Sequence, residues 1–130
     1  MRGEAYIDDM VDLCGRIMLT HHIKPEHAMR VLRIDRDNAV DMIAQGCTTT
    51  RLDEAAQERL RLFVNILHRL EHRLRHDGAA IRIALETPLD ALEGKAPAEL
   101  LGGDIAALHA VRKAIDEIQA PKVKWFRIGH

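Results

Sequence analysis

The chain has 130 residues, enough for one domain with a substantial core, and its aromatic residues are only one Trp, one Tyr and two Phe. A core built from Leu, Ile, Val, Ala and Met favours helices over sheets. The formal net charge of −1 argues against broad electrostatic binding to nucleic acids or anionic membranes. No apolar run approaches the ~20 residues of a membrane-spanning helix and no secretory signal is evident, so we expect a cytoplasmic protein with Cys14 and Cys47 reduced.

The first part of the chain predicts three helices. Residues 4–20 place apolar side chains three and four apart, on one face of an amphipathic helix. Pro25 is suited to the first position of a short second helix, and residues 35–46 predict a third helix capped by Asp35 or Asp37. The inward side of this third helix is expected to consist of Ala39, Val40, Met42, Ile43 and Ala44. Two short helices joined by a tight turn have the outline of a helix-turn-helix.

A long helix is expected from its N-cap, Asp53, to about His76. Large apolar residues recur along it at alternating spacings of three and four, which defines a heptad seam. The seam consists of Leu60, Phe63, Leu67, Leu70 and Leu74. Leu62 and Ile66 lie well off this seam, so the helix has apolar surface in two directions, as a central helix or a dimer helix would. From this surface we predict a homodimer.

The stretch "TPLDALEGKAPAELLGGD", residues 87–104, is rich in turn residues. Pro88 disfavours helix at the preceding residue, Gly94 permits a positive φ, and Pro97 can begin a one-turn helix. The stretch therefore predicts a folded connector, which either displays a rigid loop to a partner or only packs the last helix. That last, amphipathic helix begins after its cap, Asp104.

No segment predicts a sheet, because the alternating piece "AIRIAL" is too short and too isolated. The expected fold is all-α, a helix-turn-helix-like bundle followed by a small helical domain. We place the first domain at residues 1–76 and the second at residues 77–130.

The spacing of the histidines does not predict a metal site. His68, His72 and His76 are four apart, but they drift toward the side opposite the leucine seam, and we expect them to face water rather than to bind metal. His21 and His22, at a helix end, are expected to be solvated as well. The chain has no Gly-rich phosphate loop and no nucleophile elbow, which favours a binding protein over an enzyme and predicts no cofactor.

The presumed recognition helix is a poor surface for DNA. It carries Asp35, Asp37 and Asp41 against a single arginine, and acidic side chains repel phosphates. If DNA is bound, the contacts are expected at the start of this helix and in the loop after it. The candidate residues are Arg36, Asn38, Thr48 and Arg51.

The connector also carries a recognisable pattern of Pro, a spaced Leu-x-Gly and x-Pro-x-x-Leu-Leu. The matching residues are Pro88, Leu92, Gly94, Pro97, Leu100, Leu101 and Gly103. Together with the helix-turn-helix outline and the long helix, this pattern resembles the Xre/MbcA/ParS antitoxin family from about residue 25 onward. Where many members have Trp-Leu before the first proline, this chain has Ala84-Leu85, which alters the packing of that short helix.

The resemblance implies a type II antitoxin without enzymatic activity, whose C-terminal domain binds and neutralises a RES-domain toxin of an NAD-consuming family. It also implies self-association and leaves open repression of a shared promoter on operator DNA. The alternative is a stand-alone helix-turn-helix transcription regulator. The expected toxin-binding residues are Pro88, Leu92, Gly94, Lys95, Pro97, Leu100, Leu101, Trp125, Phe126 and Arg127.

Two interpretations remain for the end of the chain, where Trp125 and Phe126 lie within the last six residues. Either the pair folds back into an aromatic-poor core, or it anchors the toxin beside Arg127, since aromatic residues and arginine dominate binding hot spots.

Overall fold

The computed structural model describes residues 2–118, and every regular element within that range is a helix. The elements are α1 (Arg2–His21), α2 (Pro25–Leu32), α3 (Arg36–Gln45), α4 (Glu54–Arg73), α5 (Gly78–Leu85), the 3₁₀ turn η1 (Asp90–Leu92), α6 (Pro97–Leu100) and α7 (Ile105–Ile115). The predicted all-α fold is therefore confirmed. Within residues 2–118 no helix combines the length and the apolar character needed to cross a bilayer.

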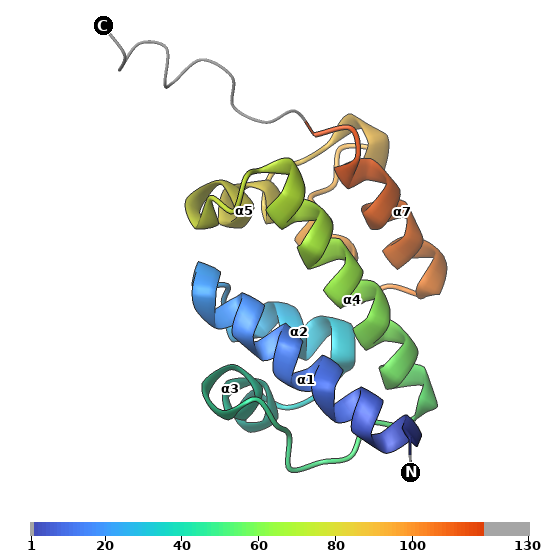
Figure 1. Ribbon diagram of the computed structural model, residues 1–130. Coiled ribbons are helices and arrows are strands. Elements are labelled where there is room, and N and C mark those ends of the chain that lie inside the picture. Colours follow the sequence, from blue (N-terminus) through green and yellow to red (C-terminus); the bar gives the residue numbers. More distant parts are fainter. Residues whose placement is uncertain (1, 119–130) are drawn as a thin grey trace, which may run out of the picture.

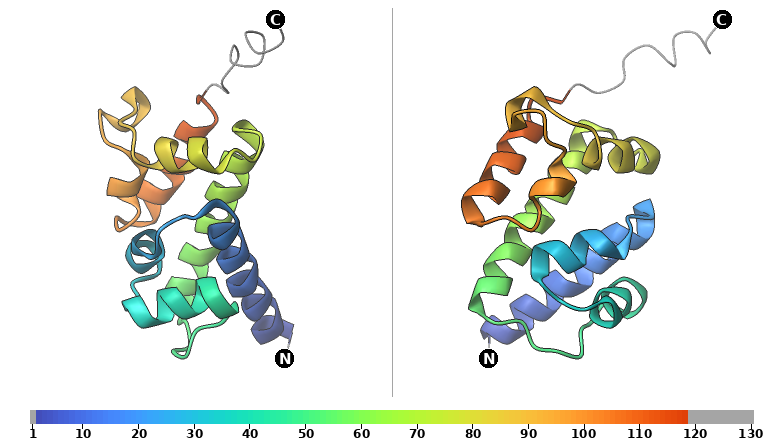
Figure 2. Two further views of the ribbon diagram at one scale, coloured as in Figure 1. Left: turned by 90° about the vertical axis from the view of Figure 1, so that its left-hand side faces the viewer. Right: turned by 180° about the vertical axis from the view of Figure 1, so that it is seen from behind.

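Helix α4 is the centre of the fold. Helices α1 and α2 pack against it, and α3 packs on those two, whereas α7 runs along another side of α4 (Figure 1). The views in Figure 2 show α1, α2 and α3 grouped at one end of the molecule and α5, α6 and α7 at the other, with α4 passing through both groups. The predicted seam is buried along its whole length, from Leu60 to Leu74.

The second apolar direction of α4 is the face that meets α7. Leu62 and Ile66 are buried within the single chain, at 8% and 0% exposure. They share a stripe, at spacings of three and four, with Arg59, Arg69 and Arg73, whose side chains all bind the segment from residue 101 to residue 118. Of the two roles expected for the long helix, that of a central helix is confirmed. Leu62 and Ile66 are therefore not free to form the interface from which a homodimer was predicted, and the homodimer itself stays a prediction.

Aspartate caps begin four of the helices. The carboxylates of Asp35, Asp53, Asp77 and Asp104 each accept a hydrogen bond from the backbone N–H three residues further on, at 2.8 to 3.1 Å. Three of these helix starts follow the sequence prediction, with Asp35 rather than Asp37 as the cap of α3.

Helix α4 ends at Arg73, three residues before the predicted end at His76. Arg75 and His76 both adopt left-handed backbone conformations, with φ of 54° and 59°. The N–H of His76 donates to the carbonyl of Glu71 at 2.8 Å, which closes the helix and turns the chain toward α5.

Helices α1 and α3 approach each other closely at Gly15. A Cβ atom at this position would lie 2.0 Å from the carbonyl oxygen of Met42, so only glycine fits there. Ala39 and Met42 are buried as predicted, but Val40 and Ala44 were predicted to face inward and are exposed. Helix α3 is therefore covered on a narrower face than its apolar pattern indicated.

The division into domains at residue 76 coincides with the turn between α4 and α5, but the core does not divide there. One cluster of buried side chains extends from Val11 in α1 to Ile115 in α7. Both parts of the chain are built on the same central helix.

Candidate functional site

The connector between α5 and α6 is a loop that closes on itself. The N–H of Leu89 donates to the carbonyl of Lys95 at 3.1 Å, and the N–H of Gly94 donates to the carbonyl of Leu89 at 3.0 Å. Glu93 and Gly94 take successive left-handed conformations, with φ of 58° and 82°, which turn the chain back. A Cβ atom on Gly94 would meet nothing within 4 Å, so the glycine is required there by its φ and not by crowding. Leu92 points inward and is buried.

Helix α6 follows as the predicted single turn. Pro97 is its first residue, and the Glu99 carboxylate accepts a hydrogen bond from the N–H of Ala96 at 2.8 Å. Leu101 at its end is fully buried, and α6 packs against both α5 and α7. The connector is consequently a rigid part of the fold.

The predicted toxin-binding residues divide into two groups. Pro88, Gly94 and Lys95 are exposed and lie on the outer side of the loop. Those that support the loop from within are the buried residues Leu92, Pro97 and Leu101 and the half-buried Leu100. Trp125, Phe126 and Arg127 lie outside the described residues, so both interpretations of the chain end stay open.

Three arginines from the first half of the chain hold the segment from Ala98 to Gly103 by its carbonyl oxygens. Arg30 donates to Ala98 at 3.0 Å, and Arg33 donates to Gly102 at 3.4 Å. Arg59 of α4 donates to the carbonyl oxygens of residues 101 and 103 at 2.7 and 2.6 Å. The segment thus owes its position to side chains of α2 and α4 as well as to its own leucines.

Arg59 is a residue of this group that the sequence analysis did not identify. It is buried, and its Nε also donates to the carbonyl of Val31 at the end of α2. Burial, together with the nearby Arg33, lowers the pKa of its guanidinium, which still remains charged. Its position, three residues before Leu62 and seven before Ile66 on the second apolar stripe, was the signal that could have identified it.

Asn38, predicted to contact DNA, has a structural role instead. Its amide is buried, and Oδ1 accepts hydrogen bonds from the N–H groups of Thr49 and Thr50 at 2.7 and 3.1 Å. Its Nδ2 donates to the hydroxyl of Thr50 and to the cap Asp35. These bonds engage both the oxygen and the nitrogen of the Asn38 amide and fix the loop after α3. The amide therefore has no free hydrogen-bonding group for a DNA base.

The other predicted DNA contacts are exposed or half-buried, and the charge of Arg36 is compensated. Arg36 forms an ion pair of 2.6 Å with Glu26 and lowers the pKa of that carboxyl group. The hydroxyl of Thr48 donates to the carbonyl of Thr50 at 2.9 Å, and Arg51 is exposed. The exposed residues of α3 therefore do not form a continuous basic patch, since they include Asp37, Val40 and Ala44.

A pocket of about 290 Å³ lies beside the connector, between α2 and α6. Lys24, Arg30 and Glu86 contribute charged groups to its lining, and Lys24 and Glu86 are paired at 3.3 Å. His27 forms the floor from α2, buried and with no hydrogen-bond partner at Nδ1. Desolvation is the main cause that lowers the pKa of His27.

The histidines of α4 and of the turn after it face water as predicted, since His68, His72 and His76 are exposed. The prediction that His21 is solvated is wrong: this residue is buried at the end of α1, and its Nε2 lies 2.7 Å from the carboxylate of Glu71. His22, the next residue, is exposed.

Comparison of the chain with protein-family models gave no match, and comparison with curated proteins gave none either.

Proposed function

We propose that this chain is the antitoxin of a type II toxin–antitoxin pair and neutralises a RES-domain toxin by binding it. The observation that carries the proposal is the form of the connector. The segment with the antitoxin-like pattern closes on itself by hydrogen bonds between Leu89, Gly94 and Lys95, and it leaves the outer side of the loop exposed. A loop that is ordered before binding loses little conformational entropy when a partner covers it.

The internal support of the loop agrees with this role. Its leucines pack inward and three arginines hold its carbonyl groups, so the exposed tip is presented in one conformation. In this proposal the buried residues of the pattern, Leu92, Pro97 and Leu101, shape the surface, and the exposed Pro88, Gly94 and Lys95 contact the toxin.

The test is to look for a RES-domain reading frame beside this chain's gene and to co-express its product with this chain. Wild type should restore growth and the cellular NAD level and should co-purify with the toxin. Lys95→Glu, which reverses one charge at the exposed tip, should weaken toxin binding at least ~tenfold, because like or unpaired charges at an interface are costly. The matched control is Lys113→Glu, which makes the same change on the exposed side of α7.

Two results would contradict the proposal. One is the absence of an adjacent RES-domain reading frame together with no binding to RES-domain toxins. The other is equal neutralisation by wild type and by a chain in which the tip residues Pro88, Gly94 and Lys95 have all been replaced, provided that the variant keeps its melting temperature.

The alternative function, a stand-alone transcription regulator, has weaker support. Helices α2 and α3 are two short helices joined by a short turn, but Asn38 is buried and Arg36 is paired with Glu26. Retention on promoter DNA that falls steeply with salt, and that an Arg36/Arg51 double alanine variant loses, would favour the regulator or an autorepressing antitoxin.

A further inference from the structure

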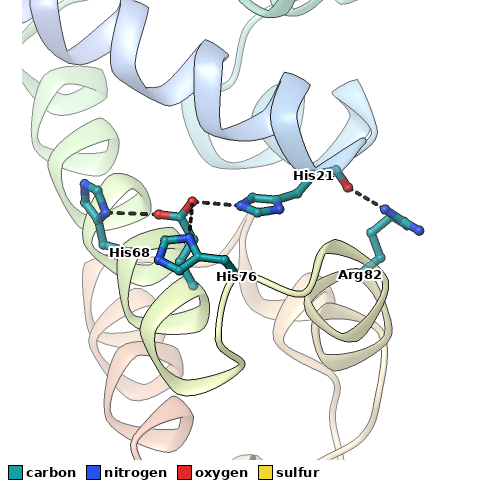
Figure 3. A network of polar contacts seen from close by, with 5 residues as sticks. His21, His68, His76 and Arg82 are labelled. Carbon is teal, nitrogen blue, oxygen red and sulfur yellow. Dashed lines mark hydrogen bonds and ion pairs between the residues drawn. The ribbon is translucent and has the colours of Figure 1, made fainter.

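Three histidines surround a single buried carboxylate at the junction of the two halves of the fold. Oε2 of Glu71 lies 2.7 Å from Nε2 of His21 and 3.5 Å from Nδ1 of His76, and Oε1 lies 3.2 Å from Nδ1 of His68. Figure 3 shows the three rings directed at this carboxylate from different sides. His21 and Glu71 are buried, whereas 69% of the His76 side chain is exposed.

Three separate pieces of the chain bring these groups together. His21 is the last residue of α1, Glu71 lies in the last turn of α4, and His76 follows α4 in the left-handed turn that leads to α5. Arg82 of α5 donates to the carbonyl of His21 at 2.6 Å and so fixes the end of α1. Gly78 leaves room for this arrangement, because a Cβ atom there would lie 3.3 Å from Nδ1 of His21.

We propose that His21, Glu71 and His76 form a binding site for a zinc ion, with two imidazoles and one carboxylate as ligands. One ligand atom from each of the three residues lies within 4.8 Å of the other two. Ligand atoms of a tetrahedral zinc ion, at ~2.0–2.1 Å from the metal, are about 3.3 Å apart. The two contacts of Oε2, at 2.7 and 3.5 Å, bracket that separation, so the Glu71 oxygen already lies at a suitable distance from each imidazole nitrogen.

The surroundings suit this ligand set. Glu71 supplies the negative charge that a dication needs, and the exposed ring of His76 leaves a route to the site from solvent. His68, through its contact with Oε1, orients the carboxylate from outside the ligand set, as outer groups commonly do in metal sites. On zinc binding, Nε2 of His21 and Nδ1 of His76 lose the protons that they donate to Oε2, each proton passing to solvent or to the other nitrogen of the same ring, and the freed lone pairs bind the metal. Water completes the fourth position.

This site does not depend on the proposed antitoxin function. A bound zinc ion would cross-link the end of α1 to the end of α4, where α5 begins, so its first effect is on stability. By linkage, an ion that binds only the folded protein at concentrations far above its Kd raises the melting temperature by several degrees.

The experiment uses the untagged full chain, freed of metal by a chelator. Zinc binding is measured by calorimetry and by the melting temperature with and without zinc chloride, and cobalt(II) serves as a spectroscopic probe of tetrahedral coordination. His76→Ala removes the exposed ligand and should weaken zinc binding at least ~tenfold, since even outer-group losses commonly reach that size. Because His76 has a left-handed backbone conformation, the melting temperature of the zinc-free variant is compared with that of zinc-free wild type. His72→Ala, which changes an exposed histidine of α4 outside the cluster, should bind zinc as wild type does.

A stoichiometry of one zinc per chain, a tetrahedral cobalt spectrum and a loss confined to His76→Ala would support the site. The proposal is overturned if wild type binds no zinc at micromolar concentrations, or if His76→Ala and His72→Ala bind it equally. In either case Glu71 and its histidines act only as an ion-pair network.

Discussion

Replacing Arg59 with methionine should destabilise the whole fold, because this side chain joins α2, α4 and the segment before α7. Methionine keeps most of the apolar stem while it removes every donor of the guanidinium. The carbonyl oxygens of Val31, Leu101 and Gly103 then lose their hydrogen bonds.

The expected loss of stability follows from these three carbonyl acceptors. A buried acceptor left without a donor costs about 1–3 kcal/mol. The bonds to Val31 and Leu101 are buried and the bond to Gly103 is half-buried, so the three losses together cost about 3 kcal/mol. Removing a buried charge offsets part of this cost, because the folded state no longer has to desolvate it. We therefore expect the free energy of unfolding to fall by about 2–4 kcal/mol, a large fraction of the ~5–15 kcal/mol typical of a domain.

Urea unfolding followed by circular dichroism measures the change, with the m-value checked for two-state behaviour. Arg59→Lys, which keeps the charge but loses the fork of donors, should lie between Arg59→Met and wild type. Arg61→Met is the control, since Arg61 is exposed on the same helix and its loss should cost less than ~0.5 kcal/mol. Equal unfolding midpoints for Arg59→Met and Arg61→Met would refute the reasoning.

Three further predictions concern other parts of the core. Gly15→Ala should lower the free energy of unfolding by about 1–3 kcal/mol in thermal or urea unfolding, because the added Cβ atom would lie 2.0 Å from a backbone carbonyl oxygen. Gly102→Ala should have little effect, since the nearest atom to its added Cβ lies 4.0 Å away. Cys14 is buried, and burial raises its pKa to about 12. A thiol reagent should therefore label only Cys47 in the native protein and both cysteines in denaturant, and rapid labelling of both thiols in the native protein would contradict this. The pKa of His27 is lowered below 6.5 in the folded state, so its contribution to stability is complete above pH 6.5 and is lost as the pH falls below that value. The free energy of unfolding, measured from pH 7 to pH 5, should therefore fall less steeply in His27→Gln than in wild type. An identical pH dependence in the two proteins would contradict a lowered pKa of His27 in the folded state.

Local sequence signals were sufficient for most of the helices. Asp53 and Asp104 cap the helices that they were expected to cap, Pro97 begins a single turn, and Gly94 adopts the positive φ that its place in the connector required. Each of these features depends on a few neighbouring residues. For that reason they can be inferred without knowing the fold.

The roles of polar side chains could not be inferred in the same way, because they depend on contacts between distant positions. The pairing of His21 with Glu71 spans 50 residues, and the bond from Arg59 to Gly103 spans 44. In the sequence each of these residues resembles an ordinary charged or polar residue of a helix surface. Asn38 was misassigned for a related reason, since its partners lie in the loop that follows α3.

The shared position of α4 also limits how such a protein can change. With one face of this helix packed on α1 and α2 and the next on α7, neither half of the chain is a module that recombination could exchange. A new second half would have to match the stripe of Leu62 and Ile66 and offer carbonyl groups to Arg59. The outer side of the connector does not take part in this packing against α4. In the proposed antitoxin, substitutions at positions such as Pro88 and Lys95 would therefore change toxin choice gradually, on a scaffold that stays the same.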